Sequence, residues 1–165
     1  MTPRRNLAAG FGLLELSLMI AGASLLLAVI LPFVKQRVIE ARASAVAHDL
    51  RAFAAAFQSN ATQRGDWPPG DGTPGTIPDG MANSLRGTNW QQPTPIGGHY
   101  AWDPNGVHQG ARHRAVIVIA STPDSPVSTD RTQLLELDRR LDDGNLAAGS
   151  LMLGYRNYPI FILEH

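Results

Sequence analysis

Glu15 is the only charged side chain in an otherwise apolar run that extends from Phe11 to Val34. Moving a charged side chain to the middle of a bilayer costs about 2.5–3.5 kcal/mol, and less near an interface. Because an ordinary apolar segment has no use for such a group, a carboxylate at this position indicates a specific role.

A second group of candidate residues follows a predicted helix, in the sequence Leu141-Asp142-Asp143-Gly144-Asn145. Aspartate and asparagine oxygens on a tight glycine turn suit a hard cation such as calcium, although the spacing is not that of an EF-hand loop. Two aspartates at a helix C-terminus also oppose the helix dipole. Asp142, Asp143 and Asn145 are therefore calcium candidates, and the alternative is a simple helix stop in which Gly144 and Asn145 form the cap and turn.

Other chemistry is weakly represented. His99, His108 and His113 have no ligand spacing of a known zinc site, so we expect them to be surface histidines. The chain has no cysteine, which excludes disulfides and cysteine metal sites. It also has no Gly-x-Ser-x-Gly elbow and no phosphate-binding glycine motif. We therefore expect a protein that is not an enzyme and that needs no cofactor other than the calcium considered above.

The run from Phe11 to Val34 is long enough to be a transmembrane helix. About 20 residues at 1.5 Å each cross about 30 Å of hydrocarbon. A secretory signal peptide, or a twin-arginine signal with Arg4 and Arg5, is the alternative. The run exceeds the roughly 7–15 apolar residues of a signal core and lacks a small-x-small cleavage site, which favours the membrane helix.

The N-terminal sequence resembles that of type IV prepilins and type II secretion pseudopilins. The resemblance lies in Gly10-Phe11, in the apolar run with Glu15 four residues after Phe11, and in Pro32 near the far end of that run. Gly12 departs from the threonine that this family most often has after the phenylalanine. The resemblance implies that residues 1–10 are a leader, that prepilin peptidase cuts after Gly10 and that Phe11 is then methylated. It also implies a helix bend at Pro32.

The same resemblance implies a structural subunit, either a pseudopilin or a minor pilin. Such a subunit crosses the bacterial inner membrane once, with its N-terminus cytoplasmic and its C-terminal domain periplasmic. Its partners are prepilin peptidase, other pilin or pseudopilin subunits and an inner-membrane assembly platform. Glu15 would then compensate the new α-amino charge at Phe11 and set the axial register between neighbours in a fibre.

Two other functions compete with that interpretation. The first is a membrane-tethered periplasmic enzyme or binding domain with an uncleaved anchor, which would have no use for Gly10 or Glu15. The second is a minor pilin that binds DNA or a surface ligand. The formal net charge is zero and the isoelectric point is about 7, so a nucleic acid partner is not expected.

Residues 35–64 continue the helix in an amphipathic form. One stripe carries apolar residues at alternating spacings of four and three: Ile39, Ala43, Val46, Leu50, Phe53 and Phe57. We expect Phe53 and Phe57 to pack against a sheet, with a coiled coil as the alternative. Gly65 and the following Asp66-Trp67-Pro68-Pro69 predict that a single helix ends near Arg64.

Residues 65–165 are expected to form one α+β domain. Residues 65–98 are rich in proline and glycine and predict a loop, with a helical turn at 81–85 and large apolar side chains that attach it to the domain. Strands are predicted at 99–102, 115–120 and 159–163, with another possible at 151–155, and a helix at 133–141 capped by Thr129 or Asp130. The predicted fold is pilin-like, a long N-terminal helix on a small antiparallel sheet.

Overall fold

The computed structural model describes residues 12–165. The predicted leader and cleavage site, residues 1–10 with Gly10, and Phe11 lie outside this range. The chain divides into an N-terminal unit that ends at Arg37 and a C-terminal unit from Val38 to His165.

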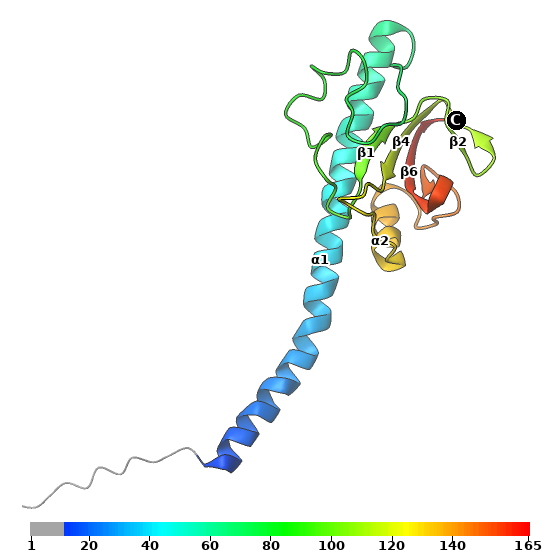
Figure 1. Ribbon diagram of the computed structural model, residues 1–165. Helices are drawn as coiled ribbons and strands as arrows, with labels where there is room; N and C mark the ends of the chain where they lie inside the picture. Colours follow the sequence, from blue (N-terminus) through cyan, green and yellow to red (C-terminus); the bar gives the residue numbers. More distant parts are fainter. Residues whose placement is uncertain (1–11) are drawn as a thin grey trace, which may run out of the picture. The chain divides into compact units, whose positions relative to one another are not determined.

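Helix α1 extends from Leu13 to Arg64 and belongs to both units (Figure 1). It continues without interruption past Pro32, as the periodicity of the sequence predicts. Gly65 follows with a φ of 82°, and its N–H donates to the Ala61 carbonyl over 2.8 Å. This left-handed conformation, which glycine adopts at no steric cost, ends the helix at the expected residue.

The C-terminal unit contains a four-stranded antiparallel sheet in the order β1-β4-β6-β5. Its strands are β1 (His99–Trp102), β4 (Ala115–Ala120), β5 (Leu151–Leu153) and β6 (Pro159–Glu164). The predicted pairing of 99–102 with 115–120 is confirmed, with Tyr100 opposite Ile119. Between them lies a small two-stranded sheet of β2 (Val107–His108) and β3 (Ala111–Arg112), which the sequence did not predict.

Helix α2 extends from Arg131 to Leu141. Of the two predicted caps the structure has Asp130, whose carboxylate accepts the Thr132 N–H over 2.9 Å. The predicted strand at 151–155 is shorter than expected. It ends at Leu153, because Tyr155–Asn157 forms a 3₁₀ turn in which Arg156 and Asn157 have positive φ.

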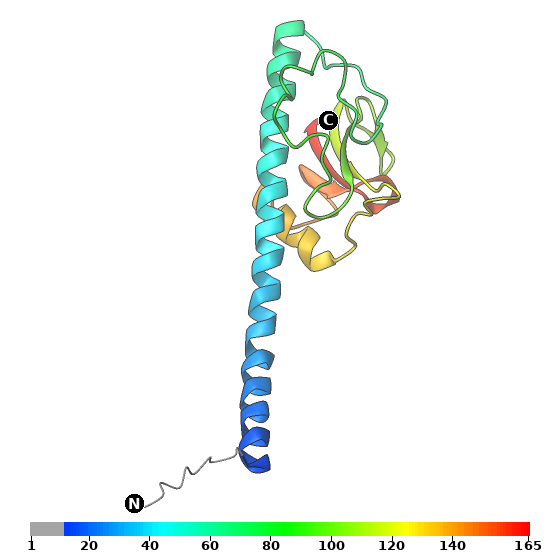
Figure 2. The same cartoon turned by 60° about the vertical axis from the view of Figure 1, so that its left-hand side comes forward.

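Inside the C-terminal unit, one face of the sheet packs against the apolar stripe of α1 (Figure 2). Ala43, Val46, Leu50, Phe53 and Phe57 are fully buried there. The Phe57 ring stacks on Trp102 with centroids 4.1 Å apart, and Phe53 meets Tyr100 edge-on at 4.8 Å. Both phenylalanines are therefore core residues of their own domain, which confirms the sheet-packing interpretation over the coiled coil.

The segment 65–98 has neither helix nor strand, as predicted, yet it is firmly attached. Met81, Leu85 and Trp90 are buried, and the Leu85 N–H donates to the Met81 carbonyl over 2.9 Å to close one helical turn. The indole N–H groups of Trp90 and Trp102 each donate over 2.8 Å to a carbonyl of this segment, those of Thr76 and Pro68. Large aromatic side chains thus fix the course of a loop that lacks the repeated backbone hydrogen bonds of a helix or a strand.

Candidate functional site

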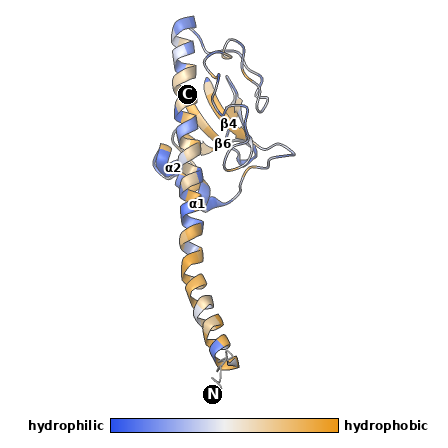
Figure 3. Cartoon of the chain, turned by 90° about the vertical axis from the view of Figure 1, so that its left-hand side faces the viewer, coloured by the Kyte–Doolittle hydropathy of each residue, from blue (hydrophilic) through white to orange (hydrophobic). Residues whose placement is uncertain are grey.

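The first candidate site is the apolar half of α1. Every residue from Gly12 to Val38 is exposed, and Figure 3 shows this part of the helix as mostly hydrophobic. An 18-residue window here has a mean hydropathy of 2.4, so the helix is long and apolar enough to cross a membrane. A continuous exposed apolar surface of this length is stable only against lipid or against other apolar protein surfaces.

Two hydroxyl groups in this half satisfy their hydrogen bonding within the helix. Ser17 Oγ donates to the Leu14 carbonyl and Ser24 Oγ to the Ile20 carbonyl, each over 2.8 Å. Such internal bonds suit a helix that has no water around it. Glu15 differs, because its carboxylate is the only charged group on an otherwise apolar surface from Gly12 to Val34.

The structure places Glu15 in the first turn of α1 and Pro32 in its middle. Unpaired N–H groups and the helix dipole favour a negative charge in the first turn. Pro32 has no N–H, so the Ala28 carbonyl lacks its helical hydrogen bond and α1 is locally weaker there. Glu15 is thus stabilised by the helix end that carries it, and a bend at Pro32 stays a prediction.

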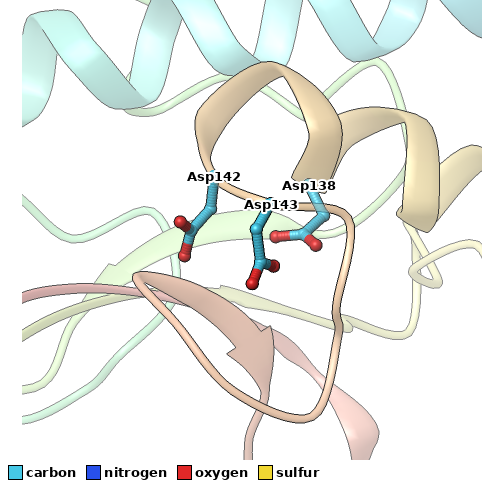
Figure 4. Close-up of side chains that lie close together, drawn as sticks. All are labelled: Asp138, Asp142 and Asp143. Atoms are coloured by element: carbon cyan, nitrogen blue, oxygen red, sulfur yellow. The ribbon is translucent and has the colours of Figure 1, made fainter.

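The second candidate site is an acidic cluster where α2 ends. Asp138, Asp142 and Asp143 each offer a carboxylate oxygen, and these three atoms lie within 4.8 Å of one another. Figure 4 shows the three carboxylates beside one another at the end of α2, with that of Asp138 turned toward Asp143. Asp142 and Asp143 are exposed, whereas Asp138 is fully buried.

Asp138 is the unusual member of this cluster. Neither of its carboxylate oxygens has a hydrogen-bond partner in the part of the chain described. Burial, with the negative charges of Asp142 and Asp143, raises the pKa of Asp138 to about 6, although the nearby N–H groups of Gly144 and Asn145 act against the shift. A buried carboxylate without a partner is costly unless it is protonated or bound to a cation.

The sequence predicted only part of this cluster. Asp142 and Asp143 come together as expected, while the Asn145 side-chain oxygen accepts the Ala147 N–H over 3.2 Å in a local turn. Asp138 was missed, although a signal was present. It lies four residues after Leu134 and therefore on the apolar face of α2, where a charged side chain is unexpected.

The prediction that the histidines are surface residues is wrong for two of the three. His108 and His113 are each only 5% exposed, and His99 is half-buried. His108 Nε2 lies 3.2 Å from Asp103 Oδ2, and His108 Nδ1 accepts the Tyr155 N–H over 3.4 Å. His108 is buried because its end of the β2–β3 hairpin lies against the segment that joins β5 to β6, where Gln109 donates to the Leu153 carbonyl. A two-residue strand does not reveal this long-range contact.

His113 lies between two other imidazoles. Its ring centroid is 6.3 Å from that of His108 and 5.4 Å from that of His165. Burial first, and then the charges of His165 and His108, lower the pKa of His113. Neither ring nitrogen of His113 has a partner among residues 12–165, so this histidine is held neutral inside the domain.

A groove of about 630 Å³ runs beside α2 and the 3₁₀ turn. Its walls are formed by backbone, aliphatic, hydroxyl, amide and guanidinium groups, and they include Arg131, Arg156 and Tyr158. The residues that line it contribute no carboxylate, imidazole or thiol side chain.

Comparison with protein-family models and with curated proteins gives no match. Among solved structures, the chain is similar to the major type IV pilin PilA1 from Clostridium difficile, with a TM-score of 0.55 and 18% sequence identity. The match covers 78% of this chain and 98% of the pilin. In this chain, the second half of the long N-terminal helix packs on a four-stranded antiparallel sheet, and its first half is apolar and exposed. The chain has a type IV pilin-like fold.

Proposed function

We propose that this protein is a structural subunit, a pseudopilin or minor pilin, of a type II secretion pseudopilus or a type IV pilus-like fibre. The observation that carries the proposal is the apolar half of α1, which is exposed from Gly12 to Val34 and interrupted by the single charge of Glu15. The pilin-like fold supports it, because such a helix needs neighbours once it leaves the bilayer.

Glu15 is assigned the register role. In a bundle of such helices, a carboxylate at a fixed depth finds an opposite charge only when the neighbouring helix sits at one height. The partner in this proposal is the α-amino group of Phe11 in an adjacent subunit, created when prepilin peptidase cuts after Gly10. An incorrectly registered neighbour leaves both charges unpaired in a low dielectric, which disfavours it strongly.

The location follows from the same proposal. Before assembly the subunit spans the inner membrane once through residues 11–34, with the leader in the cytoplasm and residues 65–165 in the periplasm. An inner-membrane assembly platform then transfers it into the fibre, where other pilin or pseudopilin subunits take the place of lipid. Pro32 would bend the helix between its apolar and amphipathic halves.

The decisive experiment replaces Glu15 by alanine in the producing bacterium. We expect Glu15→Ala to insert in the membrane and to be cleaved like the wild type, because neither step needs this charge, yet to be incorporated into sheared fibres at a small fraction of the wild-type level. Ser17→Ala is the matched control. It removes a polar group two residues away whose hydrogen bond is internal to the helix, and it should assemble normally.

Mass spectrometry of the same membrane samples identifies the N-terminal residue and so tests whether the leader has been cleaved. The expected N-terminus is a methylated Phe11 in both variants. An intact Met1, or a cut beyond Ala28, would contradict processing by prepilin peptidase. Equal incorporation of Glu15→Ala and wild type would contradict the register role, and it would favour the alternative of a tethered binding domain or enzyme, for which Glu15 has no assembly function.

A further inference from the structure

We propose that the groove beside α2 binds a short acidic segment of another protein, one that carries carboxylates next to apolar side chains. The groove has a volume of about 630 Å³. Its walls come from the connection between β4 and α2, from the first half of α2, from residues 144–147, and from the end of β5 with the 3₁₀ turn that follows it. The proposal makes no use of α1 and does not depend on fibre assembly.

The charged side chains that line the groove, Arg131 and Arg156, are both positive. Neither guanidinium forms an ion pair with a carboxylate in residues 12–165, and that of Arg156 lies over the Tyr155 ring, 5.3 Å from its centroid. Asp130 and Asp143, which precede lining residues in the sequence, each accept a backbone N–H and are not part of the lining. The groove is therefore complementary in charge to an anionic partner.

The floor of the groove is apolar. Leu134 and Leu146 are buried, Leu153 is half-buried, and all three contribute to the lining. A small inorganic anion would leave this apolar surface in water, whereas a peptide with apolar side chains beside its carboxylates covers it. Tyr155, next to Arg156, is 66% exposed, and tyrosine and arginine are residue types that protein interfaces favour. The lining thus favours a protein partner over a small anion.

The groove also gathers residues in unfavourable positions. Four non-glycine residues among residues 12–165 have a positive φ, and three of them line the groove: Gln109, Arg156 and Asn157, with φ values of 50°, 57° and 59°. Asparagine visits this conformation readily, but glutamine and arginine do not. Arg131 is unfavourable for another reason, because a cation at the first residue of α2 opposes the helix dipole. Such costs are expected to converge on one surface where that surface has a function.

The test measures binding of a defined peptide to the full chain in nonionic detergent micelles by fluorescence anisotropy. The probe is a fluorescein-labelled peptide of alternating glutamate and leucine, and the reference peptide has glutamine in place of each glutamate. We expect saturable binding of the glutamate peptide, at least about 10-fold tighter than that of the glutamine peptide and weaker at high salt. Micelles without protein give the background that arises when the peptide partitions into detergent.

Variants locate the peptide in the groove. Arg131→Glu and Arg156→Glu should each weaken binding of the glutamate peptide by about 10-fold or more. Arg86→Glu makes the same charge change at an exposed arginine outside the groove and should bind like the wild type. Arg156→Gly should also bind weakly, yet melt no lower than the wild type, because glycine adopts a φ of 57° at no steric cost. Asn105→Gly, which changes the fourth positive-φ residue outside the groove, is its control and should keep full binding.

The proposal is overturned by equal binding of the two peptides, by unchanged binding in both Arg131→Glu and Arg156→Glu, or by an equal loss in Arg86→Glu. Full competition by sodium acetate at an equal concentration of carboxylate would mean that the groove takes a small anion instead. Self-association of the wild-type chain that Arg156→Glu abolishes would mean that a second copy occupies it. Glu15→Ala should bind the peptide like the wild type, so the groove and the assembly role fail or stand separately.

Discussion

Buried polar residues of the C-terminal unit fall into two groups. Asp49 of α1 accepts hydrogen bonds from the Tyr100 hydroxyl at 3.2 Å and from the Asn89 amide at 3.3 Å, so this buried carboxylate is satisfied. His113 and Asp138 have no such partners in the described part of the chain. The first group stabilises the native packing. Burial shifts the pKa of each residue in the second group, so the free energy of unfolding depends on pH through them.

For His113 the dependence is on pH. The unfolded chain binds a proton at this histidine near pH 6.5, while the folded chain binds it only at lower pH because the native pKa is lowered. The unfolded state therefore gains the proton first as the pH falls below about 6.5, and the free energy of unfolding decreases by up to about 1.4 kcal/mol per pH unit until the native pKa is reached. We expect His113→Gln to weaken this loss of stability between pH 7 and pH 5.

The measurement is urea unfolding of the full chain in micelles at several pH values. Asp103, His108 and His165 surround the same region and remain in the variant, so the difference between His113→Gln and wild type isolates one residue. His48→Gln, on the exposed side of α1, is the control and should follow the wild-type profile. Parallel profiles for His113→Gln and wild type would contradict the prediction.

At the scale of elements, the amphipathic half of α1 is the main support of the sheet. Phe57 is fully buried and contacts both Trp90 and Trp102. We expect Phe57→Ala to lower the free energy of unfolding by about 3–5 kcal/mol, the usual cost of a large cavity in an aromatic core. Gln58→Ala, the exposed next residue, should change it by less than about 0.5 kcal/mol.

Chemical denaturation of the purified chain, monitored by tryptophan fluorescence, measures this difference. Trp90 and Trp102 report directly, since both rings touch Phe57. If Phe57→Ala unfolded at the same denaturant concentration as Gln58→Ala, the packing of α1 on the sheet would be weaker than its burial indicates.

Elements with a long regular pattern were predictable from the sequence, and elements defined by distant contacts were not. The stripe from Ala43 to Phe57, the helix end at Gly65 and the pairing of 99–102 with 115–120 all follow from spacing and turn residues. The β2–β3 hairpin has strands of two residues, too short for a periodic pattern, so the burial of His108 and His113 was not foreseen. Asp138 was not predicted as part of the acidic cluster, because only the packing of α2 brings its side chain beside Asp142 and Asp143.

For the whole molecule, the chain divides after Arg37 into two units that differ in burial, because residues 12–38 are exposed and both hydrophobic clusters lie in the second unit. Neither hydrophobic cluster of the C-terminal unit contains a residue before Ala43. We therefore expect a fragment that begins at Lys35 to fold alone in water, without detergent, and to melt within about 4 °C of the full chain in micelles. The full chain, by contrast, should stay in the membrane pellet after alkaline washing, because its apolar helix half has no protein to cover it.

Circular dichroism of the two preparations at equal pH tests this statement. The control is the full chain, which carries the same domain with the apolar half attached. A fragment without a cooperative melting transition would show that the apolar half of α1 contributes to the stability of the domain. Such a result would contradict the prediction that the C-terminal unit folds independently of the N-terminal unit.

Buried side chains, rather than exposed ones, hold the long loop between α1 and β1 in place. Its backbone carbonyls at Pro68 and Thr76 accept hydrogen bonds from buried indoles. Gly87 lies at an exposed turn with a φ of 74°, and a Cβ added there would meet no atom of another part of the described chain within 4 Å. The outward sequence of this loop can therefore change while its course is kept. In practical terms, an epitope or a fluorescent label inserted beside Gly87, with the glycine itself retained, would make the protein visible in living cells.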